Sequence, residues 1–117
     1  MRDVKEIAGY HAHVYFDAST RERAVGLREP LAQRFPVELG RVHDVPVGPH
    51  PKAMYQVAFA PDQFQNVVPW LMLNRGDSSV LVHPRTGDVV ADHITNPLWL
   101  GERLPLDADF LRAHADG

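Results

Sequence analysis

The chain has 117 residues and no cysteine. This absence excludes disulfide bonds, thiolate zinc sites and a cysteine nucleophile. Apolar runs long enough for a transmembrane helix are also missing, as is the apolar core of a signal peptide, so we expect a cytoplasmic protein with no membrane partner. Basic runs do not occur and the formal net charge is −3, which argues against nucleic acid as a partner.

Histidine, in contrast, is abundant, with seven residues in this short chain. Without thiolates, imidazole is the natural metal ligand of the sequence, and imidazole suits zinc, copper, iron and nickel. The length fits one hydrophobic core. We therefore predict that residues 1–117 form a single domain.

Hydrophobic periodicity and turn residues predict the order of the secondary-structure elements. Strands are expected over residues 10–16, 37–43, 55–59, 79–83 and 89–93, and helices over 19–35, 61–76 and 107–111. Pro30 should kink or divide the first helix, and residues 84–88 read as a hairpin turn. The order predicts an α+β, ferredoxin-like βαββαβ sandwich with a C-terminal hairpin extension. We expect sheet order 4-1-3-2, with strands 1 and 3 central and parallel, and strand 4 antiparallel to strand 1.

The first strand carries the most informative pair of residues, His11 and His13. Alternate side chains leave a strand on the same face, so the two imidazoles project together with their roots about 6.6 Å apart. Two imidazoles placed in this way can bind one divalent metal. The alternative is a pair of solvent-facing histidines on a half-buried strand.

Two further histidines are expected near this pair. His50 precedes the strand at 55–59 and His83 ends the strand at 79–83, and the assumed fold brings both to the end of the sheet where His11 lies. Since the helices should cover one sheet face, the histidine-bearing face would be open. An open face of this kind rarely stays exposed, so we expect a homodimer, or cover by the 44–52 loop and the C-terminal segment.

Several segments of the chain together resemble the DOPA 4,5-dioxygenase family. They are residues 10–16, 48–51, 68–71, 73–76, 81–84, 86–88, 92–93, 99–101 and 104–107. The resemblance implies an extradiol catechol dioxygenase that cleaves the ring of DOPA or a related catechol beside its hydroxyls, using O₂ and a non-haem Fe(II). Zinc or another divalent metal can occupy such a site after purification. The competing hypothesis is a non-catalytic, dimeric protein of the same fold that binds a metal or a small ligand.

Site roles follow from placing this chemistry on the histidines. We predict His11, His13 and His83 as metal ligands, His50 as the catalytic acid/base or as a ligand itself, and Tyr15, Arg75 and His93 as substrate-binding residues. Tyr15 could equally be a packing residue, and Arg75 could simply face solvent. Non-haem iron usually has two histidines and one carboxylate. Asp44, Asp88, Asp92 and Glu38 are the candidates for that carboxylate, and none is an obvious choice.

Overall fold

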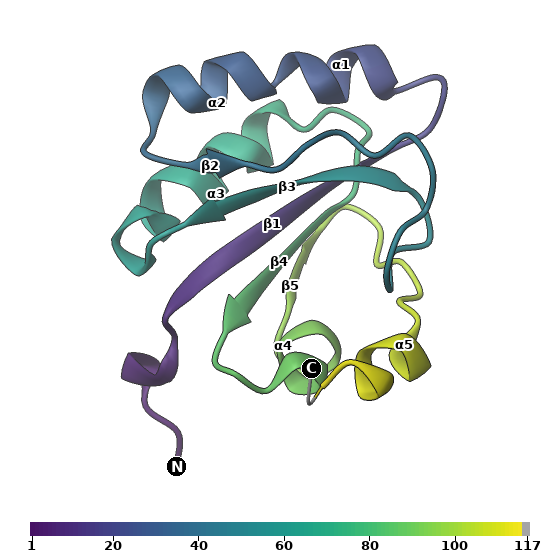
Figure 1. The fold of residues 1–117 in the computed structure, drawn as a ribbon. Coiled ribbons are helices and arrows are strands. Elements are labelled where there is room, and N and C mark those ends of the chain that lie inside the picture. Colours follow the sequence, from purple (N-terminus) through teal and green to yellow (C-terminus); the bar gives the residue numbers. More distant parts are fainter. Residues whose placement is uncertain (116–117) are drawn as a thin grey trace.

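The computed structural model describes residues 1–115, and its centre is a five-stranded antiparallel sheet (Figure 1). The strands are β1 (Gly9–Phe16), β2 (Glu38–Leu39), β3 (Ala53–Phe59), β4 (Val80–Arg85) and β5 (Leu98–Leu100), in the spatial order β2-β3-β1-β4-β5. The helices are α1 (Arg21–Gly26), α2 (Arg28–Arg34), α3 (Phe64–Asn74), α4 (Val89–Ile94) and α5 (Ala108–Ala113), with short 3₁₀ turns η1 (Val4–Glu6) and η2 (Pro61–Gln63). Figure 1 shows α1, α2 and α3 on one side of the sheet and α4 and α5 on the other. No helix in this described part combines the length and apolar content needed to cross a membrane.

The predicted α+β class and the order of the first four strands are confirmed. The expected direction of β3 was wrong, because β1 and β3 run antiparallel, with Phe16 opposite Ala53 and Tyr10 opposite Phe59. The connectivity explains this direction. The connection through α1 and α2 returns β2 parallel to β1, and β3 then lies between these two strands and pairs antiparallel with each.

The first helical segment is divided as the sequence predicted, but the division falls at Leu27 rather than at Pro30. Pro30 is the third residue of α2. Its missing N–H therefore belongs to the first turn, where backbone donors have no partner within the helix. The proline is thus accommodated in a helix start, and Leu27 forms the junction between the two helices.

The predicted strand over residues 89–93 is wrong, because this segment forms α4. The expected hairpin turn is instead the start of that helix: the carboxylate of Asp88 accepts a hydrogen bond from the backbone N–H of Ala91 at 3.1 Å. Gly87 has a φ of 96°, a conformation that favours glycine. Asp92 is buried and accepts from Thr86 through the backbone N–H at 2.9 Å and the hydroxyl at 2.6 Å. The hairpin extension is therefore a strand–helix–strand unit in which β5, not residues 89–93, pairs with β4.

The sheet has an apolar core on each face. Ala12, Val14 and Phe16 of β1 face α1–α3 and pack with residues such as Leu31 and Leu71. On the opposite face, Tyr15 packs with Met54, Leu81 and Leu104, and with Val47, Trp99 and Leu106 at the margin. We call this second surface the histidine face, because His11 and His13 alternate with the first set.

The chain itself covers the histidine face. The loop at 44–52 and the C-terminal segment meet above it, where the backbone N–H of Asp107 donates to the carbonyl of Pro49 at 2.9 Å. Gly48 lies beside the ring of Phe110. Of the two expected forms of cover, the intramolecular one is therefore present, and the homodimer stays a prediction.

Candidate metal centre

Three histidines from two neighbouring strands converge on the histidine face. His11 of β1 lies directly opposite His83 of β4, and His13 is one pleat further along β1. Each of these three side chains offers a ring nitrogen, and the three nitrogens lie within 4.8 Å of one another. This is the set that the sequence predicted as metal ligands, and it is the one such group of histidine and acidic side chains in residues 1–115.

His50 joins the cluster by a different route from the one expected. Because β3 is antiparallel to β1, the start of β3 lies at the Phe16 end of β1, away from His11. The 44–52 loop nevertheless folds back over the sheet and puts the His50 ring 4.3 Å from the ring of His13. The prediction that His50 lies near the cluster is correct, whereas the strand geometry used to place it was not.

His93 approaches the cluster from α4. Its ring centroid lies 4.0 Å from that of His83 and 6.4 Å from that of His13. The remaining two histidines lie elsewhere: His43 pairs with Met54 beyond the end of β2, and His114 stacks on Phe110 in an exposed position. Five of the seven histidines thus lie in one cluster. The sequence predicted four of them as ligands or acid/base groups and His93 as a substrate-binding residue.

Hydrogen bonds show which ring nitrogen of His83 is free. Its Nδ1 lies 2.9 Å from the carbonyl oxygen of Pro84, and a carbonyl can only accept, so Nδ1 carries the proton. The Nε2 lone pair of His83 then faces Nε2 of His13 at 3.2 Å. Two imidazole ligands of one tetrahedral ion are about 3.3 Å apart when the metal–nitrogen bonds are about 2.0–2.1 Å. The pair therefore fits a shared metal ion.

The buried surroundings keep these imidazoles neutral. Burial is the main reason that the pKa of His11 falls to about 4, and the nearby charges of Arg85 and His93 lower it further. Burial is also the main reason that the pKa of His50 falls to about 4 and that of His83 to about 3. The pKa of His13, which is the most deeply buried, lies well below its ordinary value, and the nearby His50 and His83 add repulsion. Neutral imidazole is the form that binds a metal.

The second ring nitrogen of His13, Nδ1, is a buried polar atom. It has no hydrogen-bond partner among the described residues. A buried polar atom without a partner costs about 1–3 kcal/mol, and such a cost is tolerated where a group serves a site. The fit to a metal itself comes from the converging nitrogens of His11, His13 and His83.

None of the four candidate carboxylates belongs to the cluster. Asp44 forms an exposed bidentate pair with Arg21, at 2.6 and 3.2 Å, and Asp88 caps α4. Asp92 uses both oxygens on Thr86. Glu38 lies exposed in β2, on the far side of β3 from β1. The donor set in residues 1–115 is consequently made of histidines alone.

The structure places the two other predicted substrate-binding residues, Tyr15 and Arg75, in different regions. Tyr15 lies on the histidine face with its hydroxyl oxygen 2.7 Å from Nδ1 of His50. Arg75, in contrast, ends α3 and donates to the carbonyl of Ser78 at 3.1 Å. It also lies against Gly101. Arg75 is therefore part of the packing between α3 and β5, and the structure does not bring it to the histidines.

A cavity of about 260 Å³ opens beside His93. Its walls include Trp99, Leu104 and Leu106, and Arg103 is at its margin. The ring of Trp99 lies nearly parallel to that of Tyr15, with centroids 6.0 Å apart. Sequence reasoning gave Arg103 no role, because a lone arginine between two loop segments carries no local pattern.

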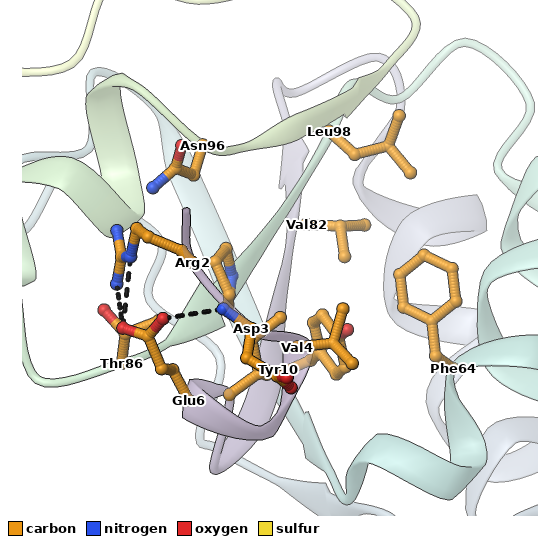
Figure 2. Close-up of a pocket in the computed structure, with 12 residues that line it drawn as sticks. Arg2, Asp3, Val4, Glu6, Tyr10, Phe64, Val82, Thr86, Asn96 and Leu98 are labelled. Atoms are coloured by element: carbon orange, nitrogen blue, oxygen red, sulfur yellow. Dashed lines mark hydrogen bonds and ion pairs between the residues drawn. The ribbon is translucent and has the colours of Figure 1, made fainter.

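A larger cavity, of about 360 Å³, lies on the opposite face of the sheet. Figure 2 shows its apolar part, formed by Tyr10, Phe64, Val82 and Leu98, beside the N-terminal turn with its Arg2–Glu6 ion pair. Tyr10 and Val82 alternate along their strands with His11 and His83. This cavity is therefore separated from the histidines by the sheet itself.

The fold and the site define an α+β protein with a candidate histidine metal centre. The family model described as the Dopa 4,5-dioxygenase family matches residues 10–110, and the chain belongs to this family. The matched region includes all five clustered histidines.

Individual relatives agree with this assignment. An "Uncharacterized 21.2 kDa protein" of Botryotinia fuckeliana is 37% identical over 115 residues, covering 88% of this chain and 63% of that protein. A "DOPA 4,5-dioxygenase" of Amanita muscaria is 33% identical over 120 residues, covering 95% of this chain and 53% of that protein. The chain thus spans 63% of the length of the first of these curated relatives and 53% of the second. The crystal structure of a "putative dioxygenase" from Nostoc punctiforme is 60% identical, has a TM-score of 0.95, and is matched over 97% of this chain and 98% of that one.

Replacing a candidate ligand should abolish metal binding without unfolding the protein. We expect His11→Ala and His83→Ala each to lose the metal that the wild type retains after loading and desalting, because each removes one of three converging nitrogens. Elemental analysis measures the metal, and circular dichroism checks the fold. His114→Ala is the control, since His114 is exposed and outside the cluster. Full metal content in both variants would show that the ligand assignment is wrong.

The metal-free protein should lose stability as the pH falls from about 7.5 toward 5. The folded-state pKa values of His11, His50 and His83 lie below the ordinary value of 6.5, so the unfolded chain binds protons in this range that the folded protein does not. Stability is then fully present above about pH 6.5 and declines as the pH drops toward the folded-state values. Urea unfolding at several pH values measures how steeply the free energy of unfolding changes with pH. The slope should be shallower in His83→Leu and unchanged in His114→Ala; a flat profile in the wild type contradicts the argument.

Proposed function

We propose that this protein is a ring-cleaving dioxygenase that acts on DOPA or a related catechol with O₂ at a non-haem Fe(II) site. One observation carries the proposal: a cluster of neutral histidines is in contact with His93, which lines a cavity with an aromatic wall. Membership of the Dopa 4,5-dioxygenase family supports the type of reaction. Since the named relatives are longer than this chain, the substrate and the reaction are our proposal and not a property carried over from them.

His11, His13 and His83 are the residues that would hold the metal. Imidazole suits iron as well as zinc, and zinc lies above Fe(II) in the affinity order, so the donors alone do not select iron. Fe(II) is proposed because the family chemistry needs it. When bound by three imidazoles, the ion supplies open coordination positions for a chelating catechol and for O₂.

The cavity beside His93 would hold the aromatic ring of the substrate. Trp99 offers a flat wall, and Leu104 and Leu106 make the surroundings apolar. Aromatic rings gain about 0.5–1.5 kcal/mol from stacked or edge contacts beyond the area they bury. These side chains would orient the ring toward the histidines and exclude water from it.

Arg103 would recognise the acidic group of a substrate such as DOPA. It lies exposed at the margin of the cavity and takes part in none of the ion pairs formed within residues 1–115. The Arg75 side chain, which the sequence predicted as a substrate-binding residue, is engaged with backbone carbonyls at the end of α3. A free guanidinium suits a carboxylate because its paired N–H groups match the two oxygens.

Proton handling would fall to the two histidines that flank the ligands. His50 and His93 each keep one ring nitrogen at the cluster while the other is held by a neighbour, Tyr15 or the carbonyl of Val89. A side chain placed in this way can accept or share the proton of a catechol hydroxyl, an effect worth about 10²–10⁴-fold in rate. A cytoplasmic location and a homodimer remain parts of the proposal.

Turnover should be detected with a panel of catechols. The protein is loaded with Fe(II) without air, then mixed with DOPA, caffeate, protocatechuate or catechol and exposed to O₂. We expect one O₂ consumed per catechol and a new visible absorbance from the opened ring for at least one compound. His83→Ala with the same added iron controls for oxidation by free metal. Iron binding without O₂ uptake on every compound would contradict the enzyme and favour a non-catalytic metal- or ligand-binding protein.

Arg103→Ala should discriminate between substrates. For catechols with a carboxylate, we expect KM to rise about 10-fold or more, as the loss of a charge-assisted hydrogen bond of about 1.5–3 kcal/mol implies. For unsubstituted catechol, KM should hardly change. Arg41→Ala is the matched control, because Arg41 is also exposed and does not line this cavity. An equal effect on both substrate types would exclude carboxylate recognition by Arg103.

A further inference from the structure

The contact between Tyr15 and His50 has a direction that can be worked out from its surroundings. The two residues come from β1 and the 44–52 loop, and the hydroxyl oxygen of Tyr15 lies 2.7 Å from Nδ1 of His50. Both side chains are buried, with 1% of Tyr15 and 7% of His50 exposed. Either group could donate in principle, since a phenol and a neutral imidazole can each donate or accept. The inference below rests on the proposed function for its catalytic part only.

The phenol must be the donor. Burial raises the pKa of Tyr15, so its hydroxyl keeps its proton. Within the described residues this hydroxyl has no hydrogen-bond partner other than His50. If Nδ1 of His50 were the donor, the Tyr15 proton would be left without an acceptor in a buried position, at a cost of about 1–3 kcal/mol. The arrangement without that cost has Tyr15 donating to Nδ1.

His50 then carries its own proton on Nε2. A neutral imidazole has one proton, and Nδ1 is occupied as an acceptor. Nε2 makes no hydrogen bond in the described part of the chain, yet it is not among the buried atoms lacking a partner, which include only Nδ1 of His13. Nε2–H of His50 is therefore open to a bound molecule.

His93 has the opposite arrangement. Its Nδ1 lies 2.8 Å from the carbonyl oxygen of Val89, so Nδ1 carries the proton and the lone pair is on Nε2. His93 also lines the 260 Å³ cavity. The two histidines beside the candidate ligands thus differ: His93 presents an acceptor to this cavity, and His50, whose ring centroid lies 4.3 Å from that of His13, presents an N–H donor.

We propose that Tyr15 is a positioning residue that fixes His50 as a hydrogen-bond donor to the bound catechol. With Nδ1 of His50 held by the Tyr15 hydroxyl, Nε2–H is the group that would stabilise negative charge on a catechol oxygen. Placed donors of this kind are worth about 10²–10³-fold in rate.

Nitrogen NMR of zinc-loaded protein with ¹⁵N-labelled histidine tests the arrangement directly. We expect His50 to show an unprotonated Nδ1 and a protonated Nε2, and His93 to show the reverse. His50→Gln and His93→Gln assign the signals. In Tyr15→Phe, His50 should shift to a mixture of both tautomers or to the Nδ1–H form. A wild-type His50 with a protonated Nδ1 would overturn the proposal.

Tyr55→Phe is the matched control for this experiment. Tyr55 is also fully buried, and its hydroxyl donates to the carbonyl of Ala24 at 2.6 Å, but on the α1–α3 side of the sheet. It should lose a similar amount of stability and leave the tautomers of His50 and His93 unchanged. If both tyrosine variants alter His50 alike, Tyr15 has only a structural role.

Steady-state kinetics test the catalytic effect of Tyr15 separately from the NMR test of the tautomers. With a catechol that the wild type turns over, Tyr15→Phe should lower kcat about 10-fold or more at unchanged metal content and nearly unchanged KM, and Tyr55→Phe should keep kcat within about twofold. Absence of turnover with every catechol would contradict the proposed function, whereas the NMR result would still decide the role of Tyr15. Turnover with an unchanged kcat in Tyr15→Phe would overturn the positioning role alone.

Discussion

The pairing of β1 with β4 is the constraint on which the rest of the site depends. His11 lies opposite His83 in an antiparallel ladder, so the backbone hydrogen bonds of the sheet fix the separation of the two side chains before any ligand binds. The two-residue period of β1 then adds His13 to the same face and sends Ala12 and Val14 into the core on the other. A slip of one residue would bury the histidines among the aliphatic side chains and expose the core. The hydrophobic effect that holds the sheet against α1–α3 thereby also holds the imidazoles in register.

The sequence predicted what depends on short-range pattern. Alternation predicted β1 with His11 and His13, and the short apolar run before His83 predicted β4. Turn residues predicted the positions of α3 and α5. Residues 89–93 were misread because Val89 and Val90 favour a strand, while the features that make the segment helical are the Asp88 cap and the buried bonds from Asp92 to Thr86. The bonds that Thr86 donates to Asp92 depend on tertiary burial, which a single sequence does not display, and the local Asp88 cap was interpreted as part of a hairpin turn. Arg103 was missed for the same reason, since its position at the cavity follows from how the loop after β5 closes over the sheet.

His50 and His93 are held in place differently from the three candidate ligands. The three candidate ligands sit on strands, where the backbone is fixed by its neighbours on both sides. The two flanking histidines sit on a loop and on a short helix, and each is oriented by a single hydrogen bond, to Tyr15 or to the carbonyl of Val89. The strands therefore hold the three candidate metal ligands rigidly, and the residues that would meet a substrate can be altered with little effect on the sheet.

The hydrogen bond between the backbone N–H of Asp107 and the carbonyl of Pro49 has a consequence for how this protein can change over evolution. It ties the loop carrying His50 to the C-terminal segment through main-chain atoms alone. Side chains on either segment can therefore diverge, and with them the walls of the cavity beside His93, while His50 stays over the sheet. What the contact does not tolerate is an insertion or deletion between β5 and α5, which would move the donor out of reach. Variation in this region should accordingly appear as substitutions at constant length.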